Sequence, residues 1–181
     1  MLKQQSLSTI LTVVVIALVV LGFQYFNHSG PFKNSGSHIS GGSMGDKEEV
    51  QVKRVIDGDT FIATDKNGKE IKVRMIGMDT PETVKPNTPV QPYGKEASDY
   101  SKKTLNHKTV YLEYDKEKHD QYGRDLAYVW LDKDHMYNKE LVEKGLAREK
   151  YFAPNGKYRE VFKEAQKQAQ DQNLNIWSRS N

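Results

Sequence analysis

Three aspartates lie near one another in the first half of the chain, at points where strand-like stretches give way to turns. Asp57 and Asp59 flank Gly58 in the stretch IDGDT, and Asp79 ends the stretch RMIGMD. In an extended backbone, residues two apart share a face, and Gly58 permits a bulge between the two acids. Carboxylate oxygens are hard ligands that suit Ca²⁺ or Mg²⁺ better than Zn²⁺. Asp-Gly is also a common turn, so a metal site and a solvent-exposed turn are equal interpretations here.

Two arginines and a glutamate could complete such a site. Arg74 lies in the alternating stretch EIKVRMI, on the side that faces outward, and Arg124 follows Gly123 in QYGR. A guanidinium binds a phosphate through paired N–H bonds. Glu82 follows Pro81 and is either a loop carboxylate or a base beside the metal. A solvated strand residue explains each arginine singly, so a phosphate site requires the fold to bring these residues together.

Other chemistries find little support in the sequence. The chain has no cysteine, which excludes disulfides, thiolate metal sites and cysteine nucleophiles. Its five histidines show no metal-ligand spacing, and GxSxG, P-loop and HExxH motifs are absent. Without Lys3 and Lys33 the body of the chain is close to neutral, so composition alone does not indicate a nucleic-acid binder.

Hydrophobic alternation and turn residues predict five strands and three helices, in the order three strands, helix, two strands, two helices. Asn67-Gly68 is a hairpin signal between the second and third strands. This order suits an α+β fold built on a five-stranded OB-like barrel. A proline-rich loop at 83–92 and a charged loop at 115–123 separate elements. The expected strands are 50–56, 60–64, 70–76, 109–114 and 126–131, and the expected helices are 93–106, 137–144 and 158–171.

Taken together, the motifs resemble the staphylococcal nuclease (thermonuclease) family. They run in order as IDGDT at 56–60, Arg74 with DTPET at 79–83, YGRDLAY at 122–128, GLA at 145–147 and LNIWS at 174–178. The resemblance covers roughly residues 50–178. It implies an OB-fold nuclease that acts as a monomer, cuts DNA and RNA with Ca²⁺, and leaves 3′-phosphates.

The resemblance also implies a metal site. Asp59, Asp79 and the backbone carbonyl of Thr80 would hold Ca²⁺, with Asp57 close by through a water molecule. Glu82 would act as general base or orient the attacking water.

It further implies how the substrate is held. Arg74 and Arg124 would bind the scissile phosphate and stabilise its charge. Tyr122 and Tyr151 would line the nucleotide pocket. The chain departs from the family at Gln121, where the family has lysine, and at Ala153, where it has a second pocket tyrosine.

The N-terminal segment predicts a membrane anchor. Residues 7–26 are uncharged and mostly Val, Leu and Ile, and as a helix they would span about 30 Å, the thickness of a hydrocarbon core. Bulky residues follow where a cleaved signal peptide has small ones, although cleavage and secretion remain the alternative. Flanking charge favours an inside N-terminus. The expected divisions are a cytoplasmic segment 1–6, the transmembrane anchor 7–26 in the lipid bilayer, a flexible extracellular linker 27–49, the nuclease domain 50–178 and a tail 179–181.

Two other functions compete with an anchored, outward-facing nuclease. One is a catalytically weak OB-fold module that binds nucleic acid at the cell surface, and the other is a Ca²⁺-binding adhesin. The adhesin leaves both arginines without a role. Degenerate binding modules lose acids or arginines, whereas this chain retains all six: Asp57, Asp59, Arg74, Asp79, Glu82 and Arg124.

Overall fold

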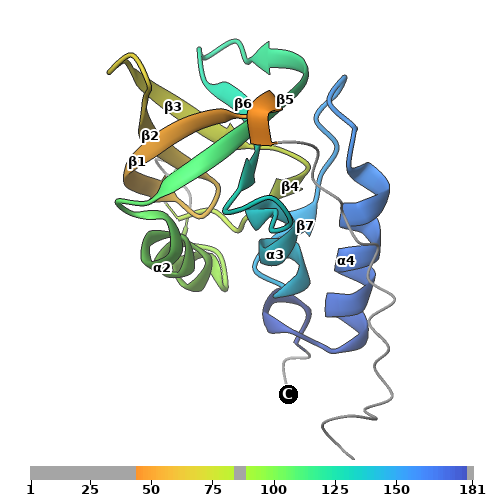
Figure 1. Ribbon diagram of the computed structural model, residues 1–181. Coiled ribbons are helices and arrows are strands. Elements are labelled where there is room, and N and C mark those ends of the chain that lie inside the picture. The colour runs from red at the N-terminus through yellow and green to blue at the C-terminus, as the bar shows by residue number, and fades with distance from the viewer. Residues whose placement is uncertain (1–43, 84–88, 179–181) are drawn as a thin grey trace, which may run out of the picture. The chain divides into compact units, whose positions relative to one another are not determined.

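A five-stranded barrel forms the centre of the fold (Figure 1). The computed structural model describes residues 44–83 and 89–178 of the chain. The strands close in the order β1-β2-β3-β6-β5, with β3 and β6 parallel and the other neighbours antiparallel. The predicted α+β barrel is confirmed. The strands are β1 (Glu48–Asp57), β2 (Thr60–Asp65), β3 (Glu70–Met75), β5 (Thr109–His119) and β6 (Asp125–Trp130).

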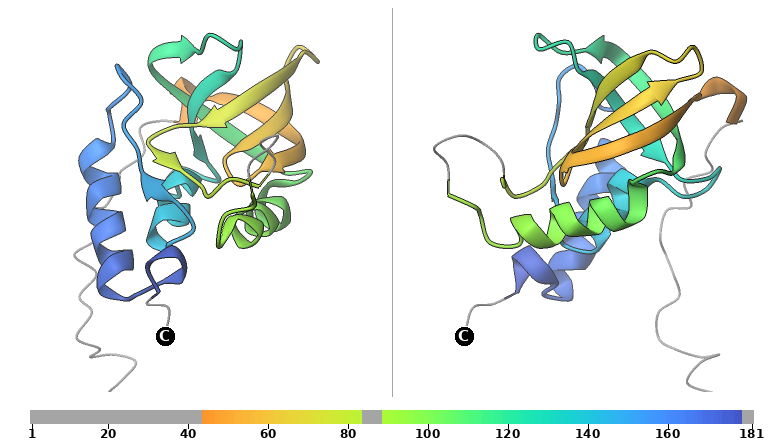
Figure 2. Two further views of the ribbon diagram at one scale, coloured as in Figure 1. Left: turned by 180° about the vertical axis from the view of Figure 1, so that it is seen from behind. Right: turned by 90° about the vertical axis from the view of Figure 1, so that its left-hand side faces the viewer.

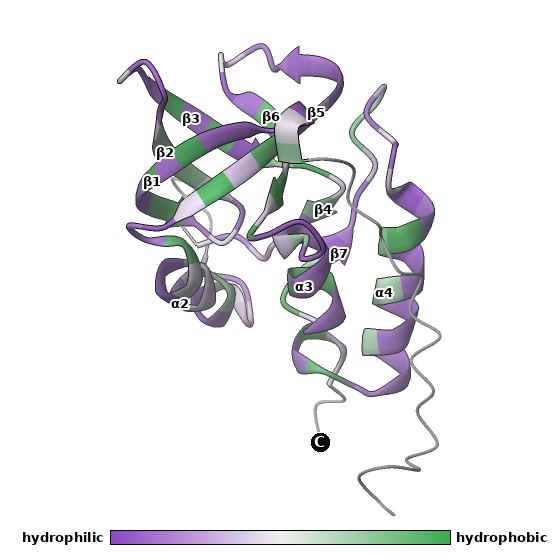
Figure 3. Ribbon diagram, viewed as in Figure 1, coloured by the Kyte–Doolittle hydropathy of each residue, from purple (hydrophilic) through white to green (hydrophobic). Residues whose placement is uncertain are grey.

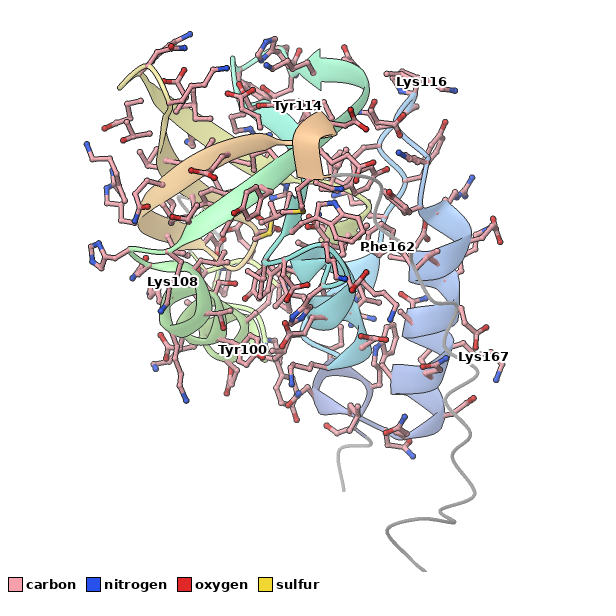
Figure 4. All side chains as sticks on the ribbon, viewed as in Figure 1. Tyr100, Lys108, Tyr114, Lys116, Phe162 and Lys167 are labelled. Atoms are coloured by element: carbon pink, nitrogen blue, oxygen red, sulfur yellow. The ribbon has the colours of Figure 1, made fainter. Side chains whose placement is uncertain are left out.

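Three helices pack around the barrel, as predicted. Helix α2 (Gly94–Leu105) lies against β1, while α3 (Tyr137–Glu143) and α4 (Arg159–Asp171) lie side by side (Figures 1 and 2). Helix α4 turns its apolar residues toward α3 and the barrel and its polar residues outward (Figure 3). Phe162, Ala165 and Ala169 of this stripe are buried, and Figure 4 shows Phe162 on the barrel side of α4.

The barrel interior is apolar because alternate strand residues point inward. On β3, Val73 and Met75 are fully buried, whereas Lys72 is exposed. Trp130 at the end of β6 is also buried and contacts Tyr158 at the start of α4, with ring centroids 6.0 Å apart. This contact joins the barrel to the C-terminal helices.

Two strands are longer at their polar ends than the sequence predicts. Strand β1 begins at Glu48, where Glu48 pairs with Leu112 of β5. Strand β5 continues to His119 through the expected charged loop, and His119 pairs with Asp125 after a register shift. These extensions are largely solvent-exposed, so they carry no apolar alternation by which a strand could be recognised.

A second, two-stranded sheet was not predicted. Strand β4 (Met78–Asp79) pairs with β7 (Arg148–Glu149), so that Asp79 lies opposite Arg148. Two-residue strands are too short to show a hydrophobic period. Gly77, just before β4, has φ +79°, and a Cβ there would lie 2.2 Å from the Phe162 ring. Only glycine therefore fits where the chain leaves β3 and approaches α4.

The predicted anchor at 7–26, the terminal segment 1–6, residues 27–43 of the linker and the tail 179–181 lie outside the described residues. Within residues 44–83 and 89–178, the structure contains no helix with the length and apolar character needed to span a bilayer.

Candidate active site

Asp57 ends strand β1 and Asp59 lies in the tight turn that follows it, so the two do not share one face of an extended strand. Strand β1 ends at Asp57, β2 starts at Thr60, and Asp57 pairs with Thr60 across the two-residue connection. The Asp57 carboxylate accepts a hydrogen bond from the Gly58 N–H at 2.7 Å. The carbonyl of Gly58 accepts one from Ser101 of α2 at 2.6 Å. The local turn therefore prevails over the extended bulge that the sequence allowed.

Arg74 connects the two aspartates that come from different turns. Its Nη1 donates to Asp59 Oδ1 and its Nη2 donates to Asp79 Oδ1. Arg74 lies on the outer face of β3, as predicted, yet its side chain is only 13% exposed. Its guanidinium lies 5.6 Å from the centre of the Phe152 ring. Its Nε is buried and has no hydrogen-bond partner among the described residues.

Thr80 fixes the Asp59 carboxylate. The Thr80 N–H and hydroxyl donate to Asp59 Oδ2 at 3.1 and 2.9 Å, and the Thr60 hydroxyl donates to Oδ1 at 3.0 Å. Burial raises the pKa of Asp59 above its usual value, while Arg74 and Thr80 act in the opposite direction. A second positive charge at this position would favour the ionised carboxylate.

Glu82 lies in a loop that hydrogen bonds hold at both ends. Its N–H donates to Gln91 Oε1 at 3.0 Å, and its carbonyl accepts the Gln91 N–H at 3.0 Å. The next residue, Thr83, donates its N–H to Glu82 Oε1 at 3.0 Å and its hydroxyl to Asp57 Oδ1 at 2.5 Å. The loop thus connects Glu82 to the turn that carries Asp57.

Arg124 comes from the turn between β5 and β6 and is oriented by Asp120. Asp120 Oδ2 accepts from Arg124 Nε at 2.7 Å, and its Oδ1 accepts the N–H groups of Tyr122 and Arg124 at 2.9 and 3.0 Å. Partial burial opposes ionisation of Asp120, but these hydrogen bonds outweigh it and lower the pKa. Gly123 supplies the turn with φ +72°.

These elements enclose one cavity of about 380 Å³. All seven residues predicted for catalysis and metal binding line it, although they come from β1, two turns, β3, β4 and a loop. Four carboxylates and three cationic side chains face the cavity, so in the fully ionised state its lining carries one net negative charge. The predicted lining residues are Asp57, Asp59, Arg74, Asp79, Thr80, Glu82 and Arg124.

Lys150 and Phe152 also line this cavity, and the sequence did not indicate either. Lys150 donates to Asp79 Oδ2 at 3.0 Å, and its N–H donates to the Gly77 carbonyl at 3.1 Å. Both residues follow β7, whose pairing with β4 brings them to the site. Only this pairing could have revealed them, and it has no sequence signal.

The two predicted nucleotide-binding tyrosines are placed differently. Tyr122 is 74% exposed and lines a neighbouring cavity of about 400 Å³, together with Gln121 and Ala153. Tyr151 lines neither this cavity nor the central one, and its ring stacks against the Arg159 guanidinium at 4.6 Å. The structure thus brings Tyr122 next to the central cavity and leaves Tyr151 outside both.

The donor set around Asp59 suits a hard cation. In the described part of the chain, no three acidic or histidine side chains converge in metal-binding geometry, so two carboxylates would need other oxygens. The Thr80 carbonyl and water molecules are oxygens of the kind that complete Ca²⁺ coordination. A divalent cation would also reverse the sign of the net charge on the cavity lining from negative to positive. The residues present therefore fit Ca²⁺.

The barrel and its cavity define an OB-fold protein with a mixed carboxylate and arginine site. Comparison with known proteins agrees: the model of a family described as staphylococcal nuclease homologue matches residues 72–179. A thermonuclease of Staphylococcus intermedius is 55% identical over 175 residues, which cover 97% of this chain and 99% of that protein. A thermonuclease of Staphylococcus hyicus is 55% identical over 174 residues, covering 96% and 99%.

A more distant relative carries a related name. Endonuclease YncB of Bacillus subtilis (strain 168) is 45% identical over 133 residues, which cover 72% of this chain and 62% of that protein. The chain therefore belongs to the staphylococcal nuclease family, and nuclease is the class of enzyme to which these relatives assign it.

Proposed function

We propose that this nuclease is a Ca²⁺-dependent endonuclease that hydrolyses phosphodiester bonds of DNA and RNA to products with 3′-phosphates. The observation that supports this most is the cavity that gathers Arg74 and Arg124, the Glu82 carboxylate and the Asp59–Asp79 pair. Separate solvated charges, the simplest explanation of the sequence, would not converge in this way.

The metal would be held by Asp59, Asp79 and the carbonyl of Thr80, with Asp57 near it through water. When bound, Ca²⁺ supplies positive charge that polarises a phosphoryl oxygen. The hydrogen bonds from Thr80 and Thr60 fix the Asp59 carboxylate before any ligand arrives. Such preorganisation lowers the cost of binding a cation.

The two arginines bind the scissile phosphate from different sides of the cavity. Asp120 accepts a hydrogen bond from Arg124 Nε, and no side chain in the described part of the chain accepts one from the two terminal nitrogens of Arg124. Arg74 Nε likewise has no partner among the described residues. Guanidinium groups placed in this way stabilise the charge that grows on the phosphoryl oxygens during attack.

Glu82 accepts the proton of the attacking water, or holds that water in line with the phosphorus. The water oxygen forms a bond to phosphorus, the bond from phosphorus to O5′ breaks, and O5′ takes up a proton and leaves as a hydroxyl group. The phosphate stays on the 3′ side, which gives the proposed products. The Glu82 N–H donates to Gln91 Oε1, which holds the backbone of Glu82, and the Thr83 N–H donates to the Glu82 carboxylate.

We further propose that residues 7–26 anchor a monomeric enzyme in the cell membrane, with the nuclease domain on the outside. The support is the uncharged, aliphatic composition of this segment. A zymogram of membrane and culture-medium fractions tests this: activity in the membrane fraction is expected, and activity only in the medium would favour cleavage and secretion.

The enzymatic proposal is tested with the full-length protein on end-labelled single-stranded DNA and RNA, with Ca²⁺ or with EGTA. We expect internal cleavage only with Ca²⁺, and product ends that a 3′-phosphatase can dephosphorylate. Binding without cleavage at saturating Ca²⁺ would instead identify a nucleic-acid-binding module. Full cleavage in EGTA would exclude the metal.

A further inference from the structure

A second groove adjoins the central cavity and shares no lining residue with the Tyr122 cavity. It has a volume of about 570 Å³, within the range of about 300–1,000 Å³ that is typical of ligand pockets. Asp79, Thr80 and Gln91 line both the groove and the central cavity, while Arg124 and Phe152 are shared by the central cavity and the Tyr122 cavity. The three hollows are therefore neighbours, and the proposed scissile phosphate site is the one that shares lining residues with both of the others.

Strand β7 and the residue after it supply cations to two of these hollows. Arg148 lies opposite Asp79 in the β4–β7 pair, and Lys150 directly follows the strand. Lys150 lines the central cavity and is paired with Asp79, whereas Arg148 lines the groove. Within residues 44–83 and 89–178, no carboxylate lies within ion-pair distance of Arg148. Its exposed charge is therefore available to an anion.

Aromatic rings border the groove and hold Arg148. The Arg148 guanidinium lies 4.4 Å from the centre of the Trp177 ring, which limits its freedom. Tyr93 lines the groove, and its hydroxyl is 2.7 Å from Ser178 Oγ. Tyr93 has φ 64°, in the left-handed region that a bulky residue rarely adopts. The fold holds this ring in the groove in spite of that backbone conformation.

We infer that the groove lined by Arg148 and Tyr93 is a subsite for the nucleic-acid strand beyond the scissile phosphate, separate from the Tyr122 cavity. A backbone-tracking cation beside an aromatic surface is the arrangement by which proteins bind single strands without sequence preference. Arg148 binds a phosphate of the continuing strand, and Tyr93 offers a ring to a neighbouring base or sugar. A strand that occupies all three hollows passes through the site, which favours internal cleavage over removal of terminal nucleotides.

This inference rests on the proposed function, but binding in EGTA tests it without cleavage. The probes are fluorescein-labelled thymidine oligonucleotides of three and twelve nucleotides, titrated by anisotropy at several salt concentrations. For Arg148→Gln we expect about a fivefold to tenfold loss of affinity for the twelve-nucleotide probe. We also expect a salt slope lower by about 0.7, the value for one phosphate contact on a single strand. The affinity of Arg148→Gln for the three-nucleotide probe should stay within about twofold of the wild-type affinity.

Three further variants separate charge from fold. Arg54→Gln removes an equal charge from an exposed residue that lines none of the three hollows, and it should leave both probes unaffected. Arg148→Lys keeps the charge and should keep the salt slope, and Tyr93→Ala should weaken only the longer probe. Equal losses for the two probes, or an unchanged salt slope in Arg148→Gln, would overturn the subsite. Loss of cleavage in the wild type with these binding results intact would instead refute the proposed function.

Discussion

Gly58 is the position where one added methyl group should disturb the metal site. A Cβ at this residue would lie 2.7 Å from the Thr80 hydroxyl oxygen and 2.9 Å from both Cβ and Cγ2 of Thr80. Real Cβ atoms essentially never approach other heavy atoms within 3.0 Å, so Thr80 must move. Thr80 holds Asp59 through two hydrogen bonds, so Gly58→Ala should displace a proposed metal ligand without changing any charge.

The expected loss of stability in Gly58→Ala follows from the packing around Gly58. Overpacking a buried site costs about 1–3 kcal/mol, and each kcal/mol lowers the melting temperature of a domain of this size by about 2–4 °C. We therefore expect a melting temperature lower by about 2–12 °C. A shift of a few tenths of an ångström at Asp59 should weaken Ca²⁺ binding by roughly tenfold, equivalent to about 1.4 kcal/mol.

A double-mutant cycle with Thr80→Ala provides the control. Thr80→Ala deletes two of the three atoms that the new Cβ meets, so Gly58→Ala should cost less in that background than in the wild type. The assays are thermal unfolding followed by tryptophan fluorescence and calorimetric titration with Ca²⁺. A wild-type unfolding midpoint together with wild-type Ca²⁺ affinity in Gly58→Ala would refute the packing argument.

Two further predictions concern Asp120, which orients Arg124, and Tyr100. Asp120→Asn removes the charge that holds Arg124 Nε and should lower kcat by roughly threefold to tenfold with little change in unfolding midpoint; an unchanged kcat would mean that Asp120 does not orient Arg124. Burial and a hydrogen bond to Glu140 raise the pKa of Tyr100 to about 12. Because this folded-state pKa lies above the unfolded value of about 10, the contribution of Tyr100 to the free energy of unfolding should be constant below pH 10 and fall from pH 10 to 12. Tyr100→Phe should flatten that fall in urea titrations, and an equal slope in the variant would contradict it.

The sequence predicted the barrel well because its evidence is local. Alternation marks the inward residues of β3, Asn67-Gly68 marks the hairpin, and the apolar spacing on α4 marks the face that Phe162 buries. These signals depend on residues a few positions apart. The predicted ends of two strands were wrong because polar residues stand there in place of alternating apolar and polar ones, as in the part of β5 that reaches His119.

The site residues that belong to sequence motifs could be predicted, and the others could not. Arg74, Asp79 and Glu82 belong to a recognisable stretch, and Arg124 follows a turn glycine. Lys150, by contrast, reaches Asp79 only because β4 pairs with β7 across about 70 residues of sequence, as the Met78–Glu149 register shows. The bond between Gln91 and Glu82 likewise depends on a closed loop that no spacing indicates. Long-range pairings of this kind can be identified only from the folded structure.

The proposed role of Glu82 is to activate water beside a Ca²⁺ ion held by Asp59 and Asp79. The direct measurement is Glu82→Gln, which keeps the size and the hydrogen-bonding oxygen but removes the negative charge. Calorimetry with Ca²⁺ and the single-turnover cleavage rate of a single-stranded DNA are measured on the same preparation. We predict Ca²⁺ affinity within about threefold of the wild type and a cleavage rate lower by about 10²–10⁴-fold, the usual contribution of a general base. A cleavage rate equal to that of the wild type would contradict the role of Glu82, and cleavage that persists in EGTA would contradict the role of the metal.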